Sequence, residues 1–156
     1  MTKVKYPSNL SAEFYKCSKT AWPNEEYAIL LGKVLKTGDL EISRLYFPSD
    51  RIATQNPDNV LVKRNWFETA HEMAETLGLV LLGDIHSHCY DIPKGEEGPM
   101  PGSDPSEADW EWAFGMKHLT GGKYRVFGIV RVMRKDGRTG CRTRFWPAVD
   151  LPKIVK

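Results

Sequence analysis

Residues 79–88 read Leu79-Val80-Leu81-Leu82-Gly83-Asp84-Ile85-His86-Ser87-His88. The stretch opens with four aliphatic residues, and a short apolar run of this kind predicts a buried strand near the centre of a sheet. A helix is predicted just before it, beginning near Asn65, where Glu68 completes a capping pattern, and ending at Gly78. The predicted buried stripe of this helix consists of Phe67, Ala70, Ala74 and Leu77.

The elements on either side of this unit are mixed in type. The other predicted elements are helices at 8–21 and 104–119, strands at 27–36, 40–47, 124–134 and 138–146, and a loop at 48–59. The helix at 104–119 is predicted from Asp104 as its cap, with Pro105 at the first helical position. Because strands and helices do not alternate regularly, the sequence predicts an α+β fold. We expect an α/β/α sandwich whose mixed, mostly antiparallel sheet is flanked by helices.

The composition is that of an ordinary globular domain. With 156 residues, 41% of them hydrophobic, the chain can bury one core, so we expect a single domain over residues 1–156. The net charge of +2 gives no reason to expect a nucleic acid partner. No apolar run approaches the roughly 20 residues that span a bilayer, so no membrane association is expected. Cys17, Cys89 and Cys141 form no CxxC pair, which favours a reducing compartment and predicts a cytoplasmic protein.

Two short motifs together have the composition of a metal site. His86 and His88 are two apart on the predicted strand, so both imidazoles point to one side of the sheet. Ser106 and Asp109 are three apart at the start of a predicted helix, so they share a helix face. Each motif alone is common without any function, but each lies here on the element that its role requires. Two nitrogens and one carboxylate oxygen form a catalytic zinc set that leaves the fourth tetrahedral position open for water.

A carboxylate upstream could supply the proton acceptor that such a site needs. Glu25 lies just before the predicted strand at 27–36, where its side chain could reach over the metal ligands. The neighbouring Glu26 is an equally available carboxylate on this reasoning. Cys89 follows His88 directly and points to the opposite face of the strand, so it is not expected to bind the metal.

The combined pattern resembles the JAMM, or MPN-plus, metalloprotease family. That family's signature is a Glu before a hydrophobic strand, then HxH, a spacer and SxxD. Glu25, His86-Ser87-His88 and Ser106 to Asp109 match this signature, and the run from Pro23 to Gly32 is similar to the family's strand. The resemblance implies a cytidine-deaminase-like MPN fold of the prokaryotic stand-alone type. In the family's register Glu25, rather than Glu26, takes the position of the catalytic carboxylate.

The resemblance also implies an activity and a role for each residue. His86, His88 and Asp109 would bind one zinc ion per chain, Glu25 would act as general base and then general acid, and Ser106 would donate a hydrogen bond to the oxyanion. The implied enzyme is a zinc-dependent isopeptidase. It would cleave the amide bond after the C-terminal Gly of a ubiquitin-like protein, in deconjugation or in precursor maturation. A ubiquitin-like protein or its conjugate is therefore the expected partner.

The sequence departs from the family pattern at three places. Seventeen residues separate His88 from Ser106, so Tyr90 to Ser103 is interpreted as an inserted loop that could bind or cover the substrate. Ala28 replaces a glycine that often follows the catalytic glutamate. Asp84 occupies a position where the family usually has an aromatic residue, and it could support His86 or simply be solvated.

Three alternatives stay open at this point. A non-catalytic MPN scaffold would bind partners without a metal, although such domains usually lose ligands that are all present here. A metallo-amidase could act on a small molecule or on a cell-wall peptide amide. A nucleic-acid-associated relative of the RadC type shares HxH and SxxD.

The six basic residues of the predicted hairpin, at 131, 134, 135, 138, 142 and 144, are interpreted either as a solvated face or as a surface for an acidic partner.

Overall fold

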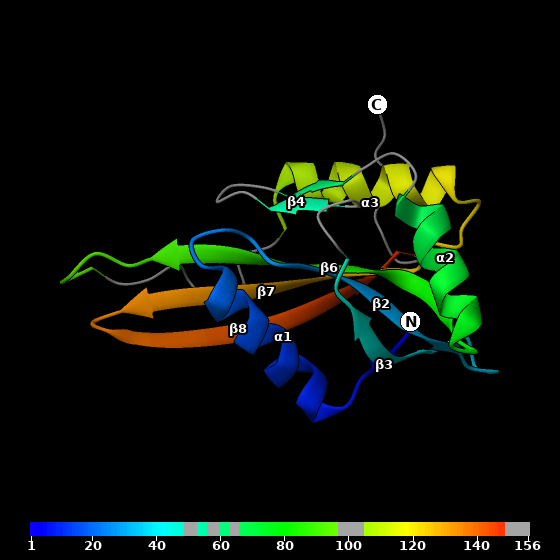
Figure 1. The fold of residues 1–156 in the computed structure, drawn as a ribbon, viewed down its shortest axis with the longest axis horizontal. Coiled ribbons are helices and arrows are strands. Elements are labelled where there is room, and N and C mark those ends of the chain that lie inside the picture. Colours follow the sequence, from blue (N-terminus) through cyan, green and yellow to red (C-terminus); the bar gives the residue numbers. More distant parts are fainter. Residues whose placement is uncertain (49–52, 56–59, 63–65, 97–104, 149–156) are drawn as a thin grey trace.

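The computed structural model describes residues 1–48, 53–55, 60–62, 66–96 and 105–148. Within these ranges the chain forms three helices and eight strands (Figure 1). The helices are α1 (Ser8–Ala21), α2 (Trp66–Thr76) and α3 (Glu107–Leu119). The strands are β1 (Val4–Lys5), β2 (Tyr27–Val34), β3 (Leu40–Tyr46), β4 (Ala53–Gln55), β5 (Val60–Val62), β6 (Val80–Asp91), β7 (Val126–Lys135) and β8 (Arg138–Pro147).

Six strands form the main sheet, in the order β1-β3-β2-β6-β7-β8. β6 lies inside the sheet, antiparallel to β2 and parallel to β7. A parallel pair needs a long crossover connection, and α3 lies in the connection between β6 and β7. The register places His86 opposite Tyr27 on β2 and opposite Ile129 on β7. The strand that carries the histidine pair is therefore held by neighbours on both sides.

The predicted α/β/α sandwich is wrong. The sheet is mixed and coils most of the way to a closed barrel, and strands account for more of the described residues than helices do. α1 contacts β3 and β7, which are separated in the sheet by β2 and β6, so the sheet curls around this helix. The strands β6, β7 and β8 contain 12, 10 and 10 residues, and the right-handed twist accumulates along strands of this length.

Two apolar clusters hold the helices to the sheet. One cluster joins Leu10 and Phe14 of α1 to the side chains of β2, β3, β6 and β7 that point toward this helix. The other joins Trp66 and Ala70 of α2 and Ala113 of α3 to the opposite side of the sheet. Full burial of a large apolar side chain stabilises a fold by about 1.5–3 kcal/mol, so these clusters fix where each helix lies.

Gly83 permits a close contact between β6 and β7. A Cβ atom at this position would lie 1.6 Å from the carbonyl oxygen of Val126. Any other residue would therefore push β7 away from β6. Since the two histidines follow on the same strand, the glycine also helps to fix the geometry of the site.

Most of the predicted elements are present, with three differences. The first helix is confirmed at Ser8–Ala21, and the strand with the histidines continues beyond His88 to Asp91. The predicted loop at 48–59 is partly wrong, because β4 lies within it and pairs with β5. The cap of α3 is Ser106 rather than Asp104, which lies outside the described residues.

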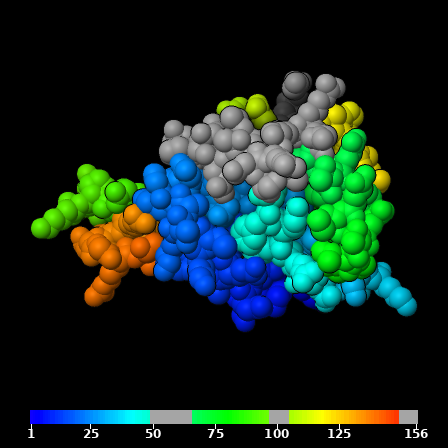
Figure 2. Space-filling model, viewed as in Figure 1, coloured from blue at the N-terminus to red at the C-terminus, as the bar shows by residue number. Residues whose placement is uncertain are grey.

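The ends of β6 and of the β7–β8 hairpin project beyond the rest of the molecule (Figure 2). None of the helices in the described part of the chain combines the length and the apolar character needed to cross a bilayer.

Candidate metal centre

The two histidines meet on one side of β6, as the alternation of a strand requires. The Nε2 atoms of His86 and His88 are 3.0 Å apart. Their side chains retain 14% and 18% of their exposure, so both are mostly removed from water while their Nε2 atoms converge. Tyr90, two residues further along the same face, brings its hydroxyl to 3.4 Å from Nδ1 of His88. A partner at Nδ1 orients the ring and leaves Nε2 for a metal.

The third ligand comes from the first turn of α3. Asp109 Oδ1 lies 2.9 Å from Nε2 of His86, and its Oδ2 lies 3.5 Å from Nε2 of His88. Ser106 and Asp109 form a capping box, in which Ser106 Oγ accepts the Asp109 N–H at 3.2 Å and Asp109 Oδ2 accepts the Ser106 N–H at 2.7 Å. The start of α3 thus fixes the carboxylate over the end of β6.

The residues present fit a zinc ion. The three candidate ligand atoms lie within 4.8 Å of one another. Ligand atoms at the usual zinc distance of about 2.0–2.1 Å, arranged tetrahedrally, are about 3.3 Å apart. The two Nε2 atoms are 3.0 Å apart, Oδ1 of Asp109 is 2.9 Å from His86, and Oδ2 of Asp109 is 3.5 Å from His88, so each separation is close to this value. Two imidazoles and one carboxylate also match the donor set of hydrolytic zinc sites, which keep a fourth position open.

Charge is concentrated in this small volume. Burial by itself would lower the pKa of His86, but the hydrogen bond and charge of Asp109, together with the charges of Asp84 and Glu25, raise it above its ordinary value. Burial acts to raise the pKa of Asp109, yet its contacts with His86 and His88 hold it well below the usual range. The carboxylate is therefore ionised, and a dication here would replace the proton that His86 otherwise attracts.

Glu25 and Glu26 act on different neighbours. Glu25 is only 7% exposed, and it lies two residues before Tyr27, which pairs with His86. Its charge contributes to the raised pKa of His86 and also raises the pKa of Cys89, so its carboxylate lies near this part of β6. The charge of Glu26 acts instead on Cys17 of α1, and its Oε1 accepts the N–H of Tyr27 at 2.9 Å. The geometry favours Glu25 as the carboxylate of the metal centre.

Ser106 is directed at Asp109. Its hydroxyl donates to Asp109 Oδ2 at 2.7 Å, and the residue itself is exposed. In this arrangement Ser106 holds a ligand in place. Its expected donation to an oxyanion stays a prediction, and it would require this hydrogen bond to be exchanged.

The sequence did not indicate the buried network around Asp84. This residue is 1% exposed and accepts hydrogen bonds from Tyr124 Oη at 2.7 Å, Trp112 Nε1 at 2.9 Å and Tyr27 Oη at 3.2 Å. Burial raises the pKa of Asp84, although the three donors oppose this shift. The interpretation of Asp84 as a solvated residue is therefore wrong. Its donors come from β2, from α3 and from the segment between α3 and β7, so only its alternation with His86 was visible in the sequence.

The remaining sequence candidates have other roles. Cys89 points away from the histidines, with its Sγ 3.7 Å from the carbonyl oxygen of Asn24, and burial raises the pKa of its thiol. Trp110 packs edge-on against Phe127, and Trp112 stacks on Trp66. The expected loop from Tyr90 to Ser103 begins only after Asp91, and residues 97–104 lie outside the described part of the chain.

The comparisons with known proteins define the fold alone. The sequence matches no protein-family model, and no curated protein matches it. A solution structure of a protein from Desulfitobacterium hafniense is similar, with a TM-score of 0.57 and 20% identity, over 90% of this chain and 82% of that one. A solution structure of a protein from Salinibacter ruber has a TM-score of 0.53 and 23% identity, over 91% and 80% of the two chains. Identities this low carry no information on activity.

Proposed function

We propose that this protein is a zinc-dependent peptidase of the JAMM, or MPN-plus, type. One observation carries the proposal. Two imidazole nitrogens and a carboxylate, contributed by β6 and α3, converge at zinc-ligand spacing beside the buried carboxylate of Glu25. A set that only stabilised the fold would not need a second acidic group on the side of the histidines.

Each residue has a defined task in the proposed reaction. Zinc, when bound, acidifies a water molecule and polarises the carbonyl of the scissile amide. Glu25 accepts a proton from the attacking water and then donates it to the leaving amine. Glu25 is only 7% exposed, so few water molecules compete with the substrate for its carboxylate. Ser106 and the start of α3 hold Asp109 in its orientation.

The proposed substrate is a ubiquitin-like protein or its conjugate, cleaved after the C-terminal Gly. The resemblance of Glu25, His86-Ser87-His88 and Ser106 to Asp109 to the family signature supports this choice. We also place the protein in a reducing compartment such as the cytoplasm, because Cys17, Cys89 and Cys141 are free thiols.

The test is hydrolysis of a fusion in which a ubiquitin-like protein ending in Gly-Gly precedes a reporter domain. The zinc-loaded wild type should release the reporter, and Glu25→Gln should bind zinc but release none. Cleavage of a short peptide amide in preference to the fusion would favour a small-substrate amidase. Zinc binding without hydrolysis of either substrate would contradict the proposal and favour the scaffold alternative.

A further inference from the structure

The sheet face that carries the metal centre continues as a row of basic side chains. In the register of β6, β7 and β8, His88 pairs with Arg131, and Arg131 pairs with Arg142. Residues paired across neighbouring strands point to the same side of a sheet, so Arg142 lies on the side of the histidines. At the usual strand spacing of about 4.8 Å, it lies roughly 10 Å from His88 along the sheet.

Three further positions extend this surface, which we call the basic face. It consists of Arg131 and Lys135 on β7 and of Arg138, Arg142 and Arg144 on β8. The side chain of Arg144 lies over the ring of Trp146, 5.1 Å from its centre, and Trp146 packs against Trp110 of α3. These contacts place Arg144 on the same side as α3 and the metal centre.

Three residues of the basic face present their charge to solvent. Lys135, Arg138 and Arg142 are exposed, and no carboxylate of the described residues forms an ion pair with any of the three. The β7–β8 hairpin contains a single acidic residue, Asp136, at its turn. The whole chain has a net charge of only +2, so the positive charge is concentrated on the basic face and is not spread over the protein.

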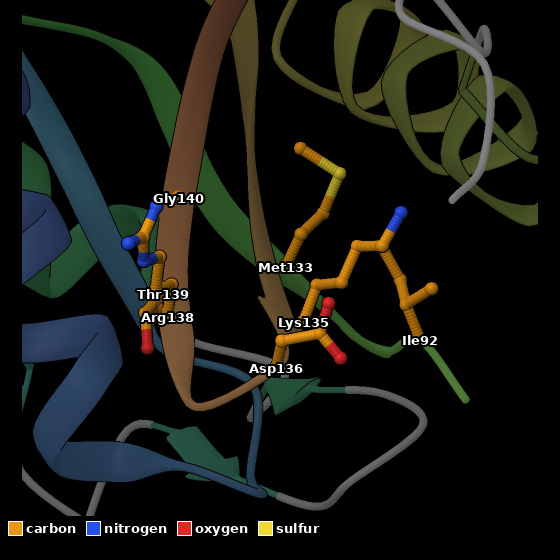
Figure 3. A pocket seen from close by; sticks show the side chains of 7 residues that line it. All are labelled: Ile92, Met133, Lys135, Asp136, Arg138, Thr139 and Gly140. Carbon is orange, nitrogen blue, oxygen red and sulfur yellow. The ribbon is translucent and has the colours of Figure 1, made fainter. Parts of the chain in front are cut away.

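A hollow of about 610 Å³ opens within this face at the end of the hairpin (Figure 3). Its lining includes Lys135, Arg138 and the apolar side chains of Ile92 and Met133. Gly140 pairs with Met133 and has no side chain to fill the space between Arg138 and Arg142. The hollow therefore offers both apolar contact and cations, and it begins two residues beyond Tyr90.

We propose that the basic face binds an extended acidic segment of the protein substrate. This inference rests on the proposed function only in naming the partner as the substrate. On a strand, residues separated by an even number share a side, so Arg138 and Arg142 suit carboxylates that are four residues apart in an extended chain. The apolar lining and Asp136 suit a polypeptide better than a phosphate backbone.

The direct test is fluorescence anisotropy with a labelled peptide that alternates Glu and Thr, compared with the same peptide carrying Gln in place of Glu. The Glu peptide should bind about tenfold tighter or better, with an affinity that falls as salt rises. Arg138→Glu/Arg142→Glu should weaken binding about tenfold, since each change replaces an attractive charge by a repulsive one. The matched control is Lys33→Glu/Lys36→Glu, which makes the same charge change at exposed positions where β2 ends and just after it. This control should alter the affinity by less than about twofold.

Two outcomes would overturn the inference. Equal affinity for the Glu and Gln peptides, or an equal loss in the control variant, would show a face that is merely solvated. Tighter binding of a single-stranded oligonucleotide than of the Glu peptide would assign the face to nucleic acid. Peptide binding is measured on EDTA-treated as well as zinc-loaded protein, so it does not depend on the zinc chemistry. Absence of hydrolysis would not affect the peptide-binding result, and absence of peptide binding would not affect the proposed zinc chemistry.

Discussion

The hydroxyl of Ser87 accepts a hydrogen bond from the backbone N–H of Glu26 at 2.7 Å, while the N–H of Ser87 donates to the carbonyl of Glu26 at 2.9 Å. Ser87 lies between the two histidines, is fully buried, and points to the opposite side of the sheet. Its hydroxyl oxygen accepts the N–H of Glu26 just before β2 begins, in place of a backbone carbonyl. The segment that carries Glu25 is thus fastened to the strand that carries the metal ligands.

Replacing Ser87 by Ala should therefore disturb Glu25 without removing the metal. A buried N–H left without an acceptor costs about 1–3 kcal/mol, which should appear as a lower free energy of unfolding in a urea titration. We expect kcat to fall about tenfold or more with KM and zinc content nearly unchanged, because a displaced base slows chemistry and not binding. Ser87→Thr keeps the hydroxyl and should restore most of kcat. Normal kcat in Ser87→Ala would show that this hydrogen bond does not position Glu25.

The two adjacent glutamates should behave differently. Glu25→Gln removes the proposed proton acceptor on the side of the histidines, so turnover should fall by about 10²-fold or more while zinc stays bound. Glu26→Gln changes a partly exposed side chain whose charge acts on Cys17 of α1, and it should leave turnover within about threefold of the wild type. The readout is single-turnover hydrolysis together with zinc content. A larger loss in Glu26→Gln than in Glu25→Gln would exchange their roles.

The buried network around Asp84 should contribute to stability. Asp84→Ala would leave two tyrosine hydroxyls and the indole N–H of Trp112 without their acceptor. We expect the free energy of unfolding to fall by about 2–4 kcal/mol. Tyr27→Phe removes only the longest of the three hydrogen bonds and should cost about 0.5–1.5 kcal/mol. Equal losses in the two variants would mean that Asp84 does not organise the network.

Zinc should stabilise the protein less in acid. Because the pKa of His86 is raised in the folded protein, protonated His86 stabilises the metal-free protein at pH values below the ordinary pKa of histidine. This stabilisation is lost as the pH rises through the raised pKa of His86. The lowered pKa of Asp109 adds stability above the ordinary range of aspartate. Zinc binds only the deprotonated imidazoles. The difference in Tm between zinc-loaded and EDTA-treated protein should therefore shrink from about pH 7.5 to about pH 5.5. A difference that is constant or grows in acid would exclude histidine ligands.

The parts of the site that depend on local periodicity could be predicted from the sequence. The alternation of His86 and His88 and the helix spacing of Ser106 and Asp109 each follow from a single element, and the structure brings all four together. The curling of the sheet around α1 could not be predicted, because it results from twist summed over strands that are distant in the sequence. The length of β6 was underestimated because residues 89–91 are extended by pairing with β7.

The central claim is that His86, His88 and Asp109 bind one zinc ion. The most direct test is elemental analysis of zinc per chain in wild type, His88→Ala and Asp109→Asn, each purified without chelator and then dialysed against a small excess of zinc. Asp109→Asn preserves an oxygen acceptor for the capping box and removes the charge, so loss of metal would not reflect loss of α3. We predict about one zinc per wild-type chain and little in either variant. A folded wild type that takes up no zinc, or variants that retain as much as the wild type, would contradict the account.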